Sequence, residues 1–225
     1  MNLLAIDAAG SSLSAAVSRG RGSYYAQTEE GMKHSELVMD LINAQMEKAD
    51  LKPSDLNGVL CMGGPGSFTG LRIGFSIAKG LALALNVPFV PVPTLECIAY
   101  SAIGLSLPVI QARKDAFFFA LFNDGRRITE DCDGHISQIT EVIRERTRKN
   151  ERLNITGPAA ASVFGCLPEE LKPFCIYSCN NKGYAAELIN IANNKNLFYT
   201  DNNAYLYSGP EYVRKTDAEI KLNSL

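Results

Sequence analysis

The order of apolar and polar residues predicts an α/β fold that begins with three strands. Residues 3–6 form a short apolar run, residues 12–18 alternate loosely between apolar and polar, and residues 23–28 follow a Gly20-Arg21-Gly22 turn. Short segments bounded by turn residues are typical of strands. Antiparallel neighbours can be joined by such tight turns, so we expect an antiparallel meander.

Two helices follow the meander in the predicted order of elements. Apolar residues recur three and four positions apart over residues 35–49, which predicts an amphipathic helix. A longer helix is predicted over residues 69–85, where Arg72 and Lys79 are the charged residues. The apolar runs at residues 56–62 and 87–92 are predicted strands. Because helices connect them, these later strands should be parallel to each other.

A second cycle of strands and helices is predicted beyond a Gly/Ser/Pro-containing connector at residues 102–107. The predicted strands are residues 108–112, 116–122, 152–156 and 173–177, and the predicted helices are residues 137–149, 184–193 and a short one near 218–222. The connector is short, so two lobes that pack together are expected. We place the first lobe at residues 1–104 and the second at 105–225, with the C-terminal helix free to pack back on the first lobe.

Composition narrows the possible functions. The 225 residues include 22 Lys and Arg against 24 Asp and Glu, a net charge of −2, which lacks the basic surface of an independent nucleic-acid binder. Two histidines make a multi-imidazole zinc site hard to build, and the six scattered cysteines suggest reduced thiols. The N-terminus lacks the basic region of a signal peptide, and the longest apolar stretch, residues 81–92, contains Asn and Pro. We therefore expect a cytoplasmic protein with no membrane contact.

A glycine-rich turn, Gly63-Gly64-Pro65-Gly66-Ser67, joins a predicted strand to the long helix. Such a turn can present backbone N–H groups to an anion at a helix N-terminus. However, the Lys-Ser/Thr pair of a P-loop is missing, and the glycine spacing does not fit the dinucleotide motif. A phosphate loop of either kind is therefore disfavoured.

The helix after this turn carries small residues four positions apart, at Gly70, Gly74, Ala78 and Ala82. They form a groove where another backbone can approach closely. The groove has two interpretations: packing on the protein's own sheet, or a helix–helix interface with a partner. The sequence leaves both open.

Asp7, at the end of the first strand, and His34, at the start of the first helix, are candidates for chemistry. Asp7 could hold Mg²⁺ through water beside a nucleotide, or it could be a turn residue. His34 has Val38 four residues later, where a two-histidine helical metal site needs a second imidazole, so a cap, core or interface role is expected. The mixed charges of residues 141–152 indicate a solvated face rather than an RNA-binding patch.

Several motifs resemble those of one family, the bacterial tRNA threonylcarbamoyladenosine biosynthesis proteins TsaB (YeaZ). The motifs are residues 64–74 (GPGSFTGLRIG), His34-Ser35-Glu36-Leu37, Ala112-Arg113-Lys114-Asp115, and the tail Pro210-Glu211-Tyr212-Val213-Arg214. Gln111 stands where the family usually has Asp. The resemblance spans the whole length, is most specific over residues 56–93 and is weak over residues 124–209.

The resemblance implies an actin-like ATPase (ASKHA) superfamily fold, with two ribonuclease H-like lobes and mixed sheets. It implies a non-catalytic paralogue of TsaD, the subunit that transfers a threonylcarbamoyl group to the adenosine beside the tRNA anticodon. The implied partners are a TsaD-like subunit, a TsaE-like ATPase that docks on the pair, and, for the chain alone, a second copy. ATP/ADP and metal are expected on the partner subunits, with no cofactor required by this chain and tRNA contacted only indirectly.

The resemblance also implies where the partner binds, with no catalytic residue and no metal ligand in this chain. The expected partner-binding residues lie on the two first-lobe helices: His34, Glu36, Leu37, Val38, Leu41, Ile42, Met46, Ser67, Phe68, Thr69, Gly70, Leu71, Arg72, Gly74 and Ala78. Asp7 and Ser11 are the possible nucleotide-binding residues, although Ala8 and Ala9 replace the hydroxyls of the family's usual Asp-Thr-Ser.

Two other activities remain as alternatives to a scaffold subunit. The first is a catalytically active ATPase or kinase of the actin-like fold, which would turn over ATP through Asp7. It is disfavoured because residues 111–122 lack the glycines of the superfamily's second phosphate loop. The second is a glycoprotease-like metallopeptidase, which fails because too few metal ligands are present.

Overall fold

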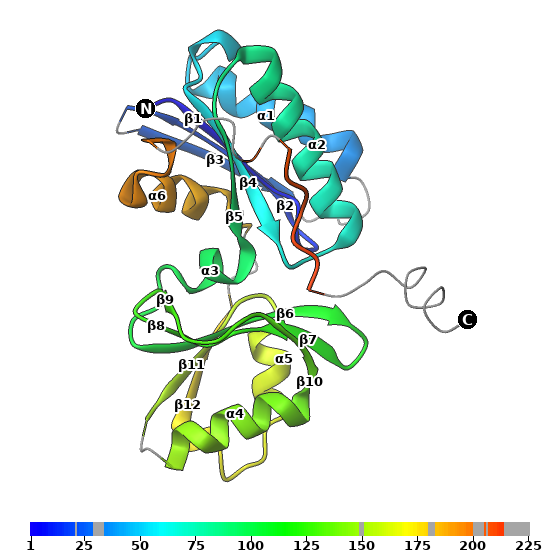
Figure 1. Cartoon of the computed structure of the whole chain (residues 1–225), viewed down its shortest axis with the longest axis vertical. Coiled ribbons are helices and arrows are strands. Elements are labelled where there is room, and N and C mark those ends of the chain that lie inside the picture. The colour runs from blue at the N-terminus through cyan, green and yellow to red at the C-terminus, as the bar shows by residue number, and fades with distance from the viewer. Residues whose placement is uncertain are drawn as a thin grey trace, which may run out of the picture.

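The structure, a computed structural model, describes residues 1–20, 22–28, 34–148, 151–179, 183–199, 205 and 207–213. The chain forms two lobes, one above the other in Figure 1. The first contains β1 (Leu3–Asp7), β2 (Leu13–Arg19), β3 (Gly22–Thr28), β4 (Gly58–Gly64) and β5 (Phe89–Pro93), in the order β3-β2-β1-β4-β5. As predicted, β1, β2 and β3 pair antiparallel, and β4 and β5 are parallel to β1.

The second sheet repeats this topology. Its main path runs β10-β7-β6-β11-β12, formed by β6 (Leu105–Arg113), β7 (Ala116–Phe119), β10 (Cys132–His135), β11 (Leu153–Thr156) and β12 (Cys175–Ser178). A small hairpin, β8 (Phe122–Asn123) and β9 (Arg126–Arg127), pairs with the start of β6. Again three antiparallel strands precede two parallel ones. Two lobes with mixed sheets of one topology confirm the predicted fold class.

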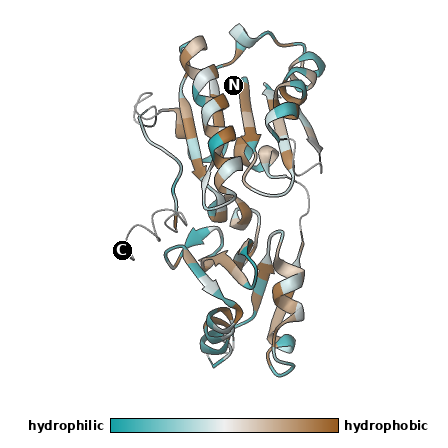
Figure 2. Cartoon of the chain, turned by 90° about the vertical axis from the view of Figure 1, so that its right-hand side faces the viewer, coloured by the Kyte–Doolittle hydropathy of each residue, from teal (hydrophilic) through white to brown (hydrophobic). Residues whose placement is uncertain are grey.

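Helices cover the outer face of each sheet. In the first lobe, α1 (His34–Lys48) and α2 (Phe68–Leu85) pack over β1, β2 and β4 (Figure 1). In the second lobe, α4 (Ile136–Arg148) and α5 (Ala160–Gly165) take the corresponding places. Short 3-10 helices span Pro53–Asp55, Lys172–Phe174 and Leu197–Tyr199. Hydrophobic residues predominate in the strands of the first sheet (Figure 2), where β1 and β4 are buried throughout.

Helices α3 (Thr94–Ala99) and α6 (Ala185–Lys195) connect the lobes, because each packs against the sheet of the other lobe. α3 follows the last strand of the first lobe and packs on β6, whereas α6 follows the last strand of the second lobe and packs on β1 and β2. Buried residues from both helices and both sheets form one continuous cluster, including Leu60, Leu95, Phe122 and Leu188. The segment expected as the second lobe, residues 105–225, therefore includes a helix, α6, that packs on the sheet of the first lobe.

Some short elements were missed at the sequence level. α3 and α5 have six residues each, too few for a helical period to be recognised. The strand expected over residues 116–122 divides into β7 and β8, and β9 and β10 were not predicted. Gly63 and Gly64, expected in the loop, are the last residues of β4. The helix expected near residues 218–222 lies outside the described residues.

α2 is long and apolar enough to cross a bilayer, and it is the one helix of the described residues that meets this criterion. A core helix of a globular protein can meet it too. Leu71, Phe75 and Ala78 are buried in the first lobe, so one face of α2 belongs to the core rather than to a lipid contact.

Candidate functional site

The start of α2 is held tightly against the turn between β1 and β2. Ser67 caps the helix, since its Oγ accepts a hydrogen bond from the Gly70 N–H at 3.2 Å. The Ser67 N–H donates to the Ala9 carbonyl at 2.8 Å, and the Gly64 N–H donates to Thr94 Oγ1 at 3.2 Å. These amides of the glycine-rich turn are bonded within the protein, so they are not a free cradle for an anion.

The stripe of small residues on α2 faces the protein's own sheet. Gly70, Gly74, Ala78 and Ala82 are all buried. A Cβ added at Gly70 would lie 1.9 Å from the Ala8 carbonyl oxygen, so glycine is needed where the helix crosses this turn. The stripe therefore packs inside the first lobe, as the first of the two interpretations expected.

The expected partner-binding residues divide into two groups. Eight are buried and cannot present their side chains to a partner in this structure: His34, Val38, Ile42, Met46, Gly70, Leu71, Gly74 and Ala78. They lie on the faces of α1 and α2 that pack against the core of the first lobe. Seven remain accessible: Glu36, Leu37, Leu41, Ser67, Phe68, Thr69 and Arg72.

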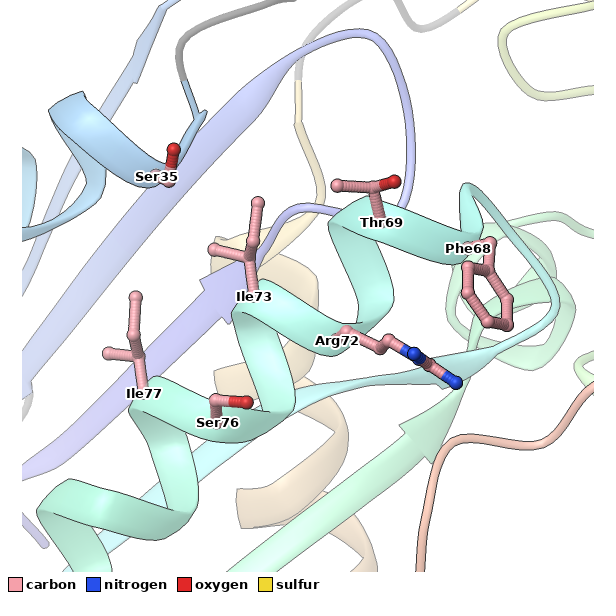
Figure 3. Close-up of a pocket in the computed structure, with 7 residues that line it drawn as sticks. All are labelled: Ser35, Phe68, Thr69, Arg72, Ile73, Ser76 and Ile77. Carbon is pink, nitrogen blue, oxygen red and sulfur yellow. The ribbon is translucent and has the colours of Figure 1, made fainter.

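A shallow groove lies between the accessible sides of α1 and α2. It has a volume of about 480 Å³ and is lined by Ser35, Phe68, Thr69, Arg72, Ile73, Ser76 and Ile77. In Figure 3, Ile73 and Ile77 project from the side of α2 that faces α1, whereas Phe68 and Arg72 project from the opposite side. Ile73 and Ile77 are half-buried beside the core, and so are Leu37 and Leu41 on α1. Of the residues that line the groove, Phe68, Ile73 and Ile77 are apolar, whereas Ser35, Thr69, Arg72 and Ser76 are polar.

Ile73, Ser76 and Ile77 were missed by the sequence analysis. The signal that could have found two of them is the four-residue spacing of Thr69, Ile73, Ile77 and Leu81, one position along from the small-residue stripe. That row is shifted by about 100° around the helix from the buried face. Apolar residues there remain partly exposed when the small residues pack on the sheet.

Asp7 is enclosed at the junction of the lobes. Its carboxylate is 4% exposed; Oδ1 accepts from the Ala9 N–H at 3.0 Å, and Oδ2 accepts from the Tyr184 N–H at 2.8 Å. Burial raises the pKa of this carboxyl group, although both hydrogen bonds oppose that change. Ser14 Oγ accepts from the Ala185 N–H at 3.2 Å, so both side chains bind amides at the start of α6.

The other residues considered for nucleotide or metal binding do not join Asp7 in an open site. Ser11 is exposed, and its carbonyl oxygen accepts a hydrogen bond from His34 Nε2 at 3.2 Å. This hydrogen bond connects the start of α1 to the loop after β1. His34 is itself 7% exposed, which agrees with a cap or core role. No group of three or more His, Cys, Asp or Glu residues able to hold a metal ion occurs within the described ranges.

A C-terminal segment, residues 207–213, runs along α2; we call it the strap. The Glu211 N–H donates to the Gly63 carbonyl at 2.8 Å, and Lys79 Nζ donates to the Ser208 carbonyl. Tyr212 lies against Phe68, with ring centroids 5.0 Å apart, and its hydroxyl accepts from Arg72 Nε at 3.2 Å. The tail motif was noticed in the sequence, but no contact with α2 could be predicted from it. Arg214 of that motif is outside the described part of the chain.

Comparisons with known proteins agree on one family. The sequence model of TsaD, tRNA N6-adenosine threonylcarbamoyltransferase, matches residues 28–222. A tRNA threonylcarbamoyladenosine biosynthesis protein TsaB from Bacillus subtilis is 30% identical over 157 residues, which cover 66% of this chain and 68% of the relative. The TsaB of Escherichia coli is 35% identical over 103 residues, 45% of this chain and 44% of the relative.

Solved structures show the same fold at low sequence identity. A Pseudomonas aeruginosa protein described as similar to peptidase YEAZ superimposes with a TM-score of 0.79 at 19% identity, covering 95% of this chain and 99% of the other. YeaZ from the same organism gives a TM-score of 0.75 at 18% identity, covering 94% and 99%. The two-lobed arrangement is therefore shared along nearly the full length of both proteins.

Proposed function

Because the chain belongs to the TsaB (YeaZ) branch of the TsaD family, we propose that it acts in the cytoplasm in the biosynthesis of threonylcarbamoyladenosine in tRNA. Its role there is that of a non-catalytic subunit that binds a TsaD-type catalytic subunit. The observation that carries this proposal is the accessible groove between α1 and α2, whose lining includes the apolar side chains of Phe68, Ile73 and Ile77.

The groove has the character of a protein-binding surface. Apolar side chains with accessible surface line it: Phe68 is 37% exposed, and Ile73 and Ile77 are half-buried. Protein interfaces combine an apolar centre with a polar rim. Ser35, Thr69 and Ser76 supply hydroxyl groups, and Arg72 supplies a charge at one end. The chemistry of the groove therefore suits a folded protein surface better than a small polar substrate.

The state of Asp7 supports a non-catalytic role. An acidic residue that holds a metal ion beside a nucleotide must keep at least one oxygen accessible. Here each carboxylate oxygen binds a backbone amide, and the side chain is enclosed between β1 and the start of α6. This arrangement disfavours the alternative of an active ATPase or kinase.

The remaining partners follow from the same proposal. A TsaE-type ATPase would dock on the pair, and in the absence of a TsaD-type subunit two copies of this chain would associate through the same groove. Nucleotide and metal would be bound by the partner subunits, and tRNA would be contacted through them. The near-neutral charge of this chain supports that division, since Lys and Arg number 22 against 24 acidic residues.

The test uses a bulky charge placed in the groove without disturbing the core. Ser76 is exposed on α2 and lines the groove, so Ser76→Arg should weaken binding to the TsaD-type protein of the same organism by roughly tenfold or more. Ser162→Arg is the matched control, because Ser162 is exposed on α5 in the second lobe. Binding is measured by titration calorimetry, with circular dichroism as the check of folding. Equal affinity of both folded variants for the partner would refute the groove as the binding site.

A further inference from the structure

The strap and the start of α2 share a three-membered cluster. The guanidinium of Arg72 lies 3.9 Å from the centre of the Phe68 ring, and the Tyr212 ring lies 5.0 Å from the same ring at an interplanar angle of 36°. Arg72 Nε donates to the Tyr212 hydroxyl at 3.2 Å. Each of the three side chains therefore contacts the other two, and two of them, Phe68 and Arg72, line the groove.

Backbone contacts fix where the strap lies. The Glu211 N–H donates to the Gly63 carbonyl at 2.8 Å, and a Cβ at Gly64 would lie 2.3 Å from the Glu211 carbonyl oxygen. Gly64 has a φ of +113°, a conformation that favours glycine. Farther along α2, Lys79 binds the Ser208 carbonyl. The glycine-rich turn thus provides the close approach that the strap needs.

The strap lies along the flank of α2 that faces away from α1. Its contacts are with Phe68, Arg72 and Lys79, whereas Ile73 and Ile77 project toward α1 (Figure 3). Thr69 and Ser76, between these two flanks, remain exposed. The strap therefore leaves the groove open and widens the surface formed by the two helices.

We propose that Tyr212 is a positioning residue of the partner-binding surface. It holds Phe68 and Arg72 in the orientation in which they contact the TsaD-type partner, an inference that rests on the function proposed above. A long arginine side chain and an exposed phenylalanine lose rotamer freedom when they are fixed. Because the strap fixes them before the partner arrives, binding does not have to supply that ordering free energy. The strap and the partner bind together rather than in competition.

The experiment compares three variants of the full chain in binding to the TsaD-type protein. Tyr212→Ala removes the ring and the hydroxyl, and affinity should fall about three- to tenfold. Tyr212→Phe keeps the ring and should show a smaller loss. Tyr207→Ala is the matched control, because Tyr207 belongs to the same strap but is 95% exposed. The thermal unfolding midpoint should be the same for all three, since Tyr212 is itself 41% exposed.

A double-mutant cycle separates positioning from an independent contact of Tyr212 with the partner. In a Phe68→Ala, Arg72→Ala background, Tyr212→Ala should cause little further loss, because the side chains that it orders are gone. A loss equal to that in the wild type would overturn the inference. So would tighter binding of Tyr212→Ala, which would mean that the strap competes with the partner.

The outcomes also distinguish this inference from the proposed function. If the wild type binds the TsaD-type protein, Ser76→Arg weakens binding and Tyr212→Ala binds like the wild type, the positioning role alone is wrong. If the wild type does not bind at all, the proposed function itself fails.

Discussion

The carboxylate of Asp7 accepts a hydrogen bond from the backbone N–H of Tyr184, 177 positions later in the chain, at 2.8 Å. The bond joins the end of the first strand to the start of the helix that returns from the second lobe. The backbone of Gly183, just before α6, also lies close to β2, since a Cβ added at Gly183 would be 2.1 Å from Ser14 Oγ. The carboxylate thus serves as an attachment point for α6.

Removing the Asp7 carboxylate should weaken the attachment of α6. Asp7→Ala leaves the buried N–H groups of Ala9 and Tyr184 without their partner, which we expect to lower the free energy of unfolding by on the order of 2 kcal/mol. Asp40→Ala, at an exposed position of α1, should stay within about 0.5 kcal/mol of the wild type. Urea denaturation measures both. Equal stability of the two variants would contradict this role for Asp7.

The stability of the wild type should fall as pH rises above about 4 because of Asp7. Burial raises the folded-state pKa of Asp7 above the ordinary value of 3.8, so in this window the folded protein binds more protons than the unfolded chain. The stabilising contribution of protonated Asp7 is fully present below pH 3.8, and it is lost as the pH rises through the folded-state pKa of this group.

Asp7→Asn isolates this effect, because an amide does not titrate. The stability of the wild type relative to Asp7→Asn should decrease as pH rises above about 4, as followed by urea denaturation. Glu187, a nearby acid whose pKa burial also raises, is present in both proteins. A relative stability that increases with pH would show that the two backbone hydrogen bonds outweigh burial.

Mg-ATP should leave the thermal unfolding midpoint of this chain unchanged. The expected reason is burial: Asp7 is 4% exposed and both of its carboxylate oxygens accept backbone N–H groups, so a hydrated magnesium ion has no access to them. Differential scanning fluorimetry with and without millimolar Mg-ATP provides the measurement. A rise in the midpoint that Asp7→Ala abolishes would instead favour the ATPase or kinase alternative.

Two glycines of α2 should respond oppositely to alanine. Gly70→Ala should destabilise the protein by about 1–3 kcal/mol, because the new Cβ would collide with the Ala8 carbonyl oxygen. Gly80 is exposed and nothing lies within 4 Å of a Cβ added there, so Gly80→Ala should stabilise the helix by up to about 1 kcal/mol. Thermal unfolding measures both. If Gly70→Ala is also stabilising, α2 does not approach the β1–β2 turn closely enough for a Cβ at Gly70 to collide with the Ala8 carbonyl oxygen.

Much of the fold could be predicted because its signals are local. The helical period of α1 and α2 and the short apolar runs of β1, β4 and β5 gave these elements to within about two residues of their observed bounds. The parallel pairing of β4 with β1 and β5 followed from the intervening helices. The motifs around the glycine-rich turn were sufficient to indicate the family. Six-residue helices such as α3 and α5 were missed because they contain fewer than two turns.

The candidate site was only half predictable. Phe68, Thr69 and Arg72 were expected to bind the partner and are exposed, whereas Val38, Ile42 and Leu71 were also assigned to the partner and are buried. Helical periodicity identifies which residues share a face, but it does not say what covers that face. Ile73 and Ile77 could be recognised as groove residues only from the structure, because the way α2 packs on the sheet leaves their side of the helix partly exposed.

The sequence by itself therefore determined the longer elements of the first lobe, the direction in which its strands pair, and the family, since these depend on residue spacing and on short motifs. The tertiary structure decided which face of α2 is buried, that Asp7 binds the start of α6, and that Tyr212 lies against Phe68 and Arg72. Those contacts join residues from about 140 to 177 positions apart. No local pattern encodes them, because each exists only when two surfaces formed by distant segments meet in the folded chain.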